Sequence, residues 1–234
     1  MHVPDGFLDA PTSVATGLVA AAAIGAALRG ARNELNDRTA PLAGLAAAFI
    51  FAAQMLNFPV ASGTSGHLLG GALAVVLVGP YTGVLCMSVV LMVQSLLFAD
   101  GGITALGTNI LLMGVVTVLV GWGIFRGLQA ALPKKLSMVA PAVAAAALIS
   151  VPVSALCFVA LYAVGGAADI PLGNLAGAMV GVHIFIGIGE AVITLLAVGS
   201  IIAVRPDLVY GARRVLAERE LELRPGAAMK GATS

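Results

Sequence analysis

Charged side chains are scarce in this chain of 234 residues. Only 10% of the residues are Asp, Glu, Lys or Arg, whereas 60% are hydrophobic, and the mean hydropathy is +1.05. A soluble core cannot bury so much apolar surface. The composition therefore predicts a polytopic membrane protein in contact with lipid, and no nucleic acid is expected as a partner.

Three further absences narrow the function. The chain has only two cysteines, Cys86 and Cys157, and both lie in apolar runs, which indicates small buried hydrophobes rather than a thiolate site. No G-x-x-x-x-G-K-[ST] sequence occurs, so ATP hydrolysis by a P-loop is not expected here, and any motor must be a separate subunit. The opening residues lack a basic n-region and contain Asp5 and Asp9, which argues against a cleavable signal. Met1 is therefore expected to be the mature N-terminus.

Apolar runs separated by charged or turn-forming stretches predict an all-α integral membrane protein, a bundle of about seven helices. The expected helices are Thr12–Leu28, Pro41–Phe58, His67–Val78, Tyr81–Phe98, Ala105–Phe125, Val139–Val164 and Leu175–Val204. The third is about a dozen residues long and cannot cross a hydrocarbon layer of about 30 Å unaided. It is expected to stack on a loop, Asn57 to Gly66, that itself enters the membrane.

The charges predict the orientation. All twelve Lys and Arg residues follow the first, fifth or seventh predicted helix, which places them on one side of the membrane. Asp5, Asp9, Asp100 and Asp169 fall on the other side. The positive-inside rule then puts the N-terminus outside and the C-terminus in the cytoplasm, in a cell (inner or plasma) membrane.

One transmembrane domain is expected over residues 1–204, with an N-terminal arm at 1–11 that folds into the bundle. Residues 205–234 are polar, with glutamates among arginines, and are interpreted as a cytoplasmic tail.

Met1 and His2 form a candidate chelate. The α-amine, the backbone nitrogen of His2 and its Nδ1 can close fused rings around one ion, which supplies three nitrogens from two residues. One further imidazole would complete a four-nitrogen plane, a geometry that suits Ni(II) or Cu(II) better than tetrahedral Zn(II). The chain has two other histidines, His67 and His183.

His67 follows the loop at the outer end of the third predicted helix, where the N-terminal arm can reach it. A turn at Pro4 and Gly6 would allow the arm to fold back. The alternative is that His67 begins the helix and binds only the loop backbone.

Several other polar residues lie in apolar helices. His183 and Glu190 are seven residues apart, so they lie on nearly the same helix face. An ionisable pair inside the membrane suggests a function, and a hydrogen-bonded packing pair is the alternative. The amides Gln54, Asn57, Gln94 and Asn109 are expected to cross-link helices or hold the arm rather than bind metal.

A function of another class is also compatible with part of the sequence. Gly63 to Gly66 matches the G-x-S-G of rhomboid intramembrane serine proteases, with Ser65 as nucleophile and His183 as general base. That interpretation leaves Met1 and His2 unexplained.

Several long motifs resemble the CbiM/NikM family, the substrate-capture (S) components of energy-coupling-factor (ECF) transporters for cobalt and nickel. They are MHVPDGFL at residues 1–8, NFPV at 57–60, GTSGHLLGG at 63–71, QSLLFADGGITALG at 94–107 and HIFIGIGEAVIT at 183–194. The resemblance extends from residue 1 to about residue 204, and the tail carries no family motif.

The resemblance implies a seven-helix fold and a metal site made by the Met1 amine, the backbone and side-chain nitrogens of His2, and the His67 side chain. It also implies four partners: a transmembrane coupling (T) subunit, two ABC ATPases and a small membrane accessory protein. We therefore expect a non-enzymatic substrate-binding subunit of a metal importer, with no resident cofactor. Nickel is favoured by the planar geometry, and cobalt follows because family members serve both metals.

Overall fold

The computed structural model describes residues 1–37, 39–56, 58–60, 64–218 and 220. Eight α-helices are described: α1 (Ala10–Gly30), α2 (Ala40–Gln54), α3 (Gly71–Val78), α4 (Pro80–Leu97), α5 (Leu106–Asn109), α6 (Thr117–Ala131), α7 (Val139–Gly165) and α8 (Leu172–Val204). A π-helical stretch, η3 (Ile110–Val116), joins α5 to α6. Short 3-10 turns are η1 (Ala31–Asn33), η4 (Leu136–Met138), η5 (Pro206–Leu208) and η6 (Tyr210–Ala212).

The prediction of an all-α membrane protein is confirmed. In the part of the chain that the structure describes, five helical segments are long and apolar enough to cross a membrane: Ala10–Asn33, Pro80–Leu97, Leu106–Ala131, Leu136–Gly165 and Leu172–Val204. The two shorter helices of the predicted seven are α2, with 15 residues, and α3, with 8 residues that are all buried.

The third helix starts later than predicted, at Gly71 instead of His67, and the second ends earlier, at Gln54 instead of Phe58. Between them, β1 (Phe58–Val60) and β2 (Thr64–Gly66) form an antiparallel hairpin. Gly70 has φ of +84°, and a Cβ there would lie 2.7 Å from Ile50 Cγ2. This left-handed conformation, which only glycine adopts readily, delays the helix. His67 therefore lies in an extended segment between β2 and α3.

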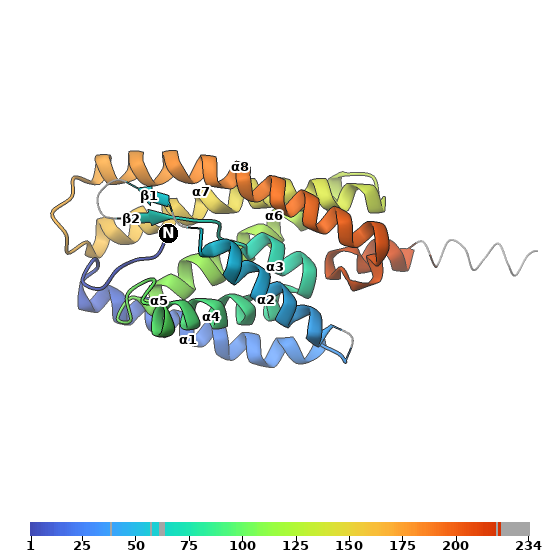
Figure 1. Cartoon of the computed structure of the whole chain (residues 1–234), viewed down its shortest axis with the longest axis horizontal. Helices are drawn as coiled ribbons and strands as arrows, with labels where there is room; N and C mark the ends of the chain where they lie inside the picture. The colour runs from blue at the N-terminus through green and yellow to red at the C-terminus, as the bar shows by residue number, and fades with distance from the viewer. Residues whose placement is uncertain (38, 57, 61–63, 219, 221–234) are drawn as a thin grey trace, which may run out of the picture.

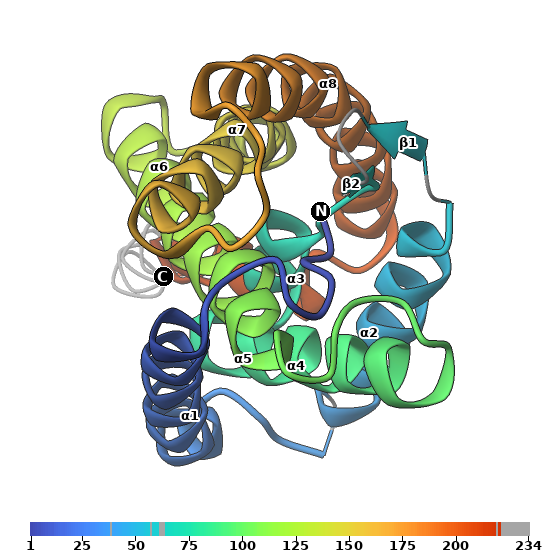
Figure 2. The same cartoon turned by 90° about the vertical axis from the view of Figure 1, so that its left-hand side faces the viewer.

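The short helix α3 lies in the middle of the bundle. Seen along the long axis, α1, α2, α4, α6, α7 and α8 surround it, and the N-terminus lies beside β2 (Figures 1 and 2). Two apolar clusters fill the interior. One surrounds α3 and includes Phe125 and Val143, and the other includes Met1, Leu69 and Phe158. The arm is thus part of the second core.

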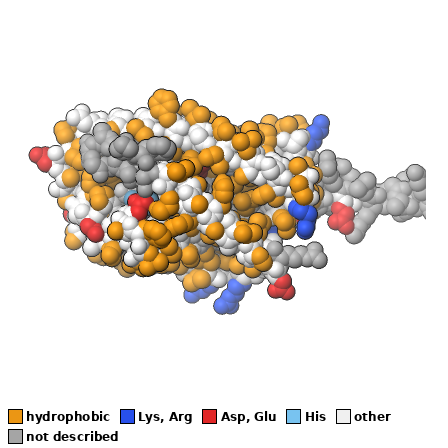
Figure 3. All heavy atoms as spheres, in the orientation of Figure 1, with side chains coloured by type: hydrophobic (Ala, Val, Ile, Leu, Met, Phe, Trp, Pro, Cys, Tyr) orange, Lys and Arg blue, Asp and Glu red, His pale blue; other side chains and the backbone are white. Residues whose placement is uncertain are grey.

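The chain continues to pack after α8 ends at Val204. Val209, Ala212 and Val215 are buried in the cluster around α3, and Gln129 Nε2 donates a hydrogen bond to Gly211 O at 2.9 Å. The division into a domain at 1–204 and a tail at 205–234 stays a prediction. On the face drawn in Figure 3, the Lys and Arg side chains lie near the end of α8 and along the lower edge, and none is seen at the opposite end of the molecule.

Candidate metal centre

The N-terminal arm runs into the bundle and is buried. Met1 and Val3 are each 1% exposed and His2 is 6% exposed. The Val3 N–H donates to Asn109 Oδ1 at 2.7 Å, and Val3 O accepts from Asn109 Nδ2 at 3.2 Å and from Gly102 N at 2.9 Å. Asn109 thus satisfies the arm backbone in the interior, where an unpaired amide would be costly.

A second set of contacts holds the arm where it leaves the bundle. Asp9 N donates to Gly165 O at 2.7 Å, and Ala167 N donates to Phe7 O at 3.0 Å. The Phe7 ring packs on Phe158 and Tyr162 with centroids 5.6 and 5.3 Å apart. These contacts join the arm to the end of α7.

The hydrogen bonds of His2 select a tautomer. Its Nε2 lies 3.1 Å from Gln94 Oε1, an atom that can only accept, so Nε2 carries the proton and Nδ1 keeps a lone pair. Nδ1 also lies 3.1 Å from Asp100 Oδ1, but without the alignment of a hydrogen bond. The lone pair of Nδ1 therefore has no donor directed at it among the described residues.

His67 has the complementary tautomer. Its Nδ1 lies 2.7 Å from Leu68 O, so Nδ1 is the protonated nitrogen and donates. Its Nε2 is buried and has no hydrogen-bond partner among the described residues. A buried polar atom without a partner calls for an explanation such as a ligand or an ion.

The two imidazoles and the terminal amine lie together. The rings of His2 and His67 are stacked, with centroids 4.3 Å apart. Burial lowers the pKa of the Met1 α-amine from 8.0 to about 4, against a smaller opposing effect of Asp100. Burial, then the neighbouring N-terminal amine and His2, lower the pKa of His67 well below its usual value. Both groups are thus neutral bases at pH 7.

No group of three or more His, Cys, Asp or Glu side chains suited to a metal occurs among the described residues. Two of the four expected donors are main-chain nitrogens, however, so the arrangement has to be judged from Met1, His2 and His67. The structure brings these three sequence-predicted residues together in one buried place.

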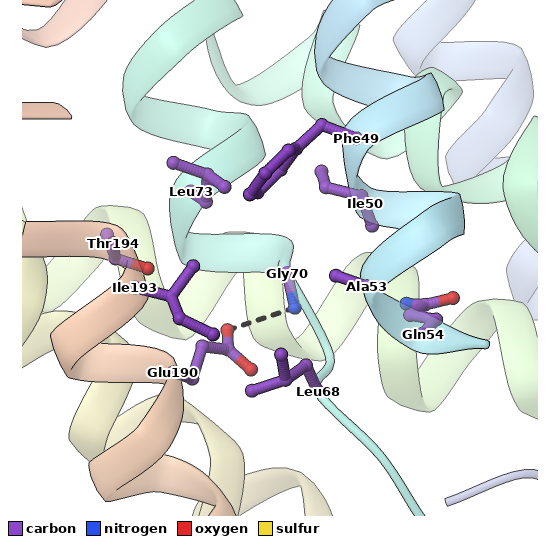
Figure 4. A pocket seen from close by; sticks show the side chains of 10 residues that line it. All are labelled: Phe49, Ile50, Ala53, Gln54, Leu68, Gly70, Leu73, Glu190, Ile193 and Thr194. Atoms are coloured by element: carbon purple, nitrogen blue, oxygen red, sulfur yellow. Dashed lines mark hydrogen bonds between the residues drawn. The ribbon is translucent and has the colours of Figure 1, made fainter. Parts of the chain in front are cut away.

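The backbone that follows His67 is fixed from two sides. Glu190 on α8 accepts hydrogen bonds from Leu69 N at 2.7 Å and from Gly70 N at 3.0 Å. Gln54 Nε2, at the end of α2, donates to Leu69 O at 2.6 Å. Figure 4 shows Glu190 and Gln54 on opposite sides of the segment that leads to Gly70. A neutral amide and a carboxylate thus set the position of the His67 main chain.

His183 and Glu190 are both buried, at 0% and 3% exposure, but their hydrogen bonds go to different partners. His183 Nδ1 donates to Met179 O of its own helix at 2.7 Å, while both Glu190 oxygens bind residues 69 and 70. The hydrogen-bonded pair weighed from the sequence is therefore not formed. His183 Nε2 is buried without a hydrogen-bond partner among the described residues.

Three of the four amides behave as the sequence predicts: Gln94 and Asn109 hold the arm, and Gln54 links α2 to the His67 segment. The fourth, Asn57, lies outside the described residues. The sequence favours a turn at Asp100-Gly101-Gly102 and leaves a supporting role at the metal site as the second interpretation; the structure brings Asp100 against His2. The only signal for this contact in the sequence is the place of Asp100 within the family-like stretch 94–107.

Comparisons with known proteins agree with this architecture. Residues 2–208 match the family model described as CbiM, cobalt uptake substrate-specific transmembrane region. A putative metal transport protein of Haloquadratum walsbyi is 43% identical over 90% of this chain and 94% of its own length. A putative fused nickel transport protein NikMN of Archaeoglobus fulgidus is 47% identical over 55% of this chain and 43% of its own, so the match spans less than half of that fused protein.

The fold comparison gives the same result. A solved structure described as a truncated transition metal transporter superposes with a TM-score of 0.80 at 27% identity, covering 87% of this chain and 99% of its own. The alternative of a serine protease using Ser65 and His183 is not supported by these relatives, whose names describe metal transport. The chain therefore belongs to the CbiM family and is a multi-pass membrane component of cobalt or nickel transport.

Proposed function

We propose that this chain is the substrate-binding subunit of an ATP-driven ECF importer, and that it captures the ion with four nitrogens. The donors are the Met1 amine, the deprotonated main-chain nitrogen of His2, His2 Nδ1 and His67 Nε2. The transported substrate is Ni²⁺ in the first place and Co²⁺ in the second, because a plane of four nitrogens suits Ni(II).

One observation carries the proposal: the two stacked imidazoles make their hydrogen bonds through the nitrogens that the chelate does not use. Gln94 holds the proton of His2 on Nε2, and the Leu68 carbonyl holds that of His67 on Nδ1. Hydrogen bonds of this kind orient metal-binding histidines and fix their tautomers. With the amine also neutral, the site needs little reorganisation before an ion enters.

The energy for transport comes from other subunits in this proposal. The partners are a transmembrane coupling subunit, two ABC ATPases and a small membrane accessory protein, with the N-terminus outside and the C-terminus cytoplasmic. α1 offers a surface for a partner helix, because few of its residues are buried and both Ala22 and Ala26 are exposed on it. Small residues four apart allow close approach of another membrane helix.

The test uses purified protein whose N-terminal sequence has been checked by mass spectrometry. One glycine placed before Met1 turns the amine into an amide and moves His2 to third position. We expect Ni²⁺ affinity to fall by more than about 100-fold. Removing a residue that only hydrogen-bonds to a metal ligand lowers affinity by about 10–100-fold, and here a ligand itself is lost.

The matched control is one glycine added after Ser234, which should bind normally. Competition among Ni²⁺, Co²⁺, Cu²⁺ and Zn²⁺ on the unmodified protein then gives the selectivity. Wild-type affinity in the N-terminally extended protein would refute the chelate.

A further inference from the structure

The loop between α4 and α5 places Asp100 in contact with His2 of the N-terminal arm. Ala99, just before it, has φ of +52°, an uncommon conformation for a residue with a side chain. Asp100 N donates to Gln94 O at 3.0 Å. Gly101 has φ of +95°, and a Cβ there would lie 3.1 Å from His2 Cδ2. The turn therefore follows the surface of His2 closely.

The Asp100 carboxylate lies beside two of the four proposed donors. Its Oδ1 is 3.1 Å from His2 Nδ1, and its charge also acts on the Met1 amine. The side chain is 19% exposed, so the carboxylate stands at the border between the buried site and the outside. The oxygen and the nitrogen are close but not aligned for a hydrogen bond, which leaves the Nδ1 lone pair free to bind an ion.

The net charge of the site with the ion bound gives a reason for the Asp100 carboxylate beside it. The ion brings two positive charges, the deprotonated main-chain nitrogen of His2 brings one negative charge, and the amine and both imidazoles are neutral. One positive charge remains in a buried place, where an uncompensated charge is costly. The buried carboxylate of Glu190 is bound to Leu69 N and Gly70 N.

We propose that Asp100 is a positioning residue for the transported ion: it makes the loaded site electrically neutral and holds the ion without replacing a nitrogen donor. This inference rests on the proposed four-nitrogen site. It assigns to Asp100 the recognition of a divalent cation rather than a structural role in the turn.

The test compares Asp100→Asn with Asp169→Asn, which removes an exposed carboxylate from the loop between α7 and α8. Asparagine keeps the shape of aspartate and one acceptor oxygen, so a turn residue would tolerate it. We expect Asp100→Asn to lower Ni²⁺ affinity by about 10–100-fold, the range for partners of metal ligands, and Asp100→Glu to restore part of it. Asp169→Asn should bind like the unmodified protein.

The absorption spectrum of the Ni²⁺-saturated protein separates the possible failures. At saturating metal, Asp100→Asn should show the same planar four-nitrogen spectrum as the unmodified protein, because its donors are intact. Unchanged affinity would overturn the inference, and so would loss of the spectrum at saturation, which would mean a role in folding. Absence of that spectrum from the unmodified protein would instead refute the proposed site itself.

Discussion

Two buried glutamates accept backbone hydrogen bonds at the two ends of the short helix α3. Glu34, after η1, accepts hydrogen bonds from Tyr81 N at 3.2 Å and Thr82 N at 2.7 Å, at the start of α4. Glu190 accepts from Leu69 N and Gly70 N, just before α3. Each helix follows a glycine with positive φ, Gly79 at +100° and Gly70 at +84°. The amides that bind Glu34 belong to the first turn of α4 and have no partner within the helix, so a carboxylate is favourable there. The amides that bind Glu190 precede α3.

The surroundings of the two glutamates differ. Glu34 packs tightly: a Cβ on Gly79 would lie 2.6 Å from Glu34 Cδ. Glu190 borders a cavity of about 20 Å³, lined also by Gln54 and Thr194 (Figure 4). Gln54 Oε1 and Thr194 Oγ1 are buried there without hydrogen-bond partners among the described residues. A space of this size holds about one water molecule.

The same kind of hydrogen bond therefore has two different roles in this molecule. At the end rich in Lys and Arg, Glu34 joins the turn after α1 to α4 and fixes helices only. At the end that holds the arm, Glu190 fixes the backbone two and three residues after His67 and leaves space beside it. We infer that the packing beside Glu190 is looser because this carboxylate positions the segment that carries the metal ligand His67.

The largest effect on metal binding should come from removing a donor at the site end. His67→Ala takes away the fourth nitrogen, and we expect Ni²⁺ affinity to fall by more than about 100-fold. The variant should stay folded, because the site is local and His67 makes no hydrogen bond across helices that the structure describes. Equilibrium metal competition and the thermal stability of the monodisperse protein in detergent measure the two quantities. An unfolded variant would favour the structural role of His67.

The direct test of the comparison is Glu190→Gln beside Glu34→Gln. Glutamine keeps one acceptor oxygen but turns an NH₂ group toward a backbone N–H, so each variant should lose about 1–3 kcal/mol of stability. Only Glu190→Gln should also weaken Ni²⁺ binding, by about 10–100-fold, because it frees the segment that carries His67. Thermal unfolding and metal competition on both proteins check this. Equal losses of affinity would break the comparison.

A smaller effect concerns protons. At pH 7 the amine of a free peptide of residues 1–6 is protonated, since its ordinary pKa is 8.0, whereas the buried Met1 amine, with a pKa of about 4, is not. Nickel binding should therefore release about one proton from the folded protein, which comes from the His2 amide. It should release about two from the peptide, which come from that amide and from the terminal amine. Calorimetry in buffers of different ionisation enthalpy counts them. Equal proton release from both would contradict the buried neutral amine.

The same pKa shift predicts how the arm responds to acid. Between pH 8 and pH 4 the withdrawn arm binds a proton that the inserted arm does not, so insertion weakens as the pH falls through this range. Hydrogen exchange of the Val3 amide at several pH values, corrected for intrinsic exchange, follows arm insertion.

The smallest change in affinity is expected for His183→Gln. Its Nδ1 binds only its own helix, and glutamine can keep one hydrogen bond, so metal affinity should be nearly unchanged. We expect uptake by the assembled complex to fall, because an unpaired imidazole nitrogen buried near His67 is costly to keep for packing alone. Binding by the isolated protein and uptake in cells separate the two roles. Normal uptake would leave a packing role.

The sequence by itself was enough for the membrane class and the seven helices, because hydropathy and helix length are local properties. It also predicts a donor set, which stays a prediction: the Met1 amine and the main-chain and side-chain nitrogens of His2 can close rings around one ion. The amides that hold the arm were found because polar residues are rare in these apolar helices, where each one needs a partner.

Only the tertiary structure decided which distant groups meet. The end of the second helix, the start of the third and the position of His67 depend on the strand pair β1–β2 and on left-handed Gly70, where Ile50 leaves no room for a side chain. The bonds of Glu190 to residues 69 and 70, the approach of Asp100 to His2 and the burial of Val215 join segments far apart in the chain. Periodicity reports which face of a helix is buried, but the partner on that face is set by how all the helices pack together.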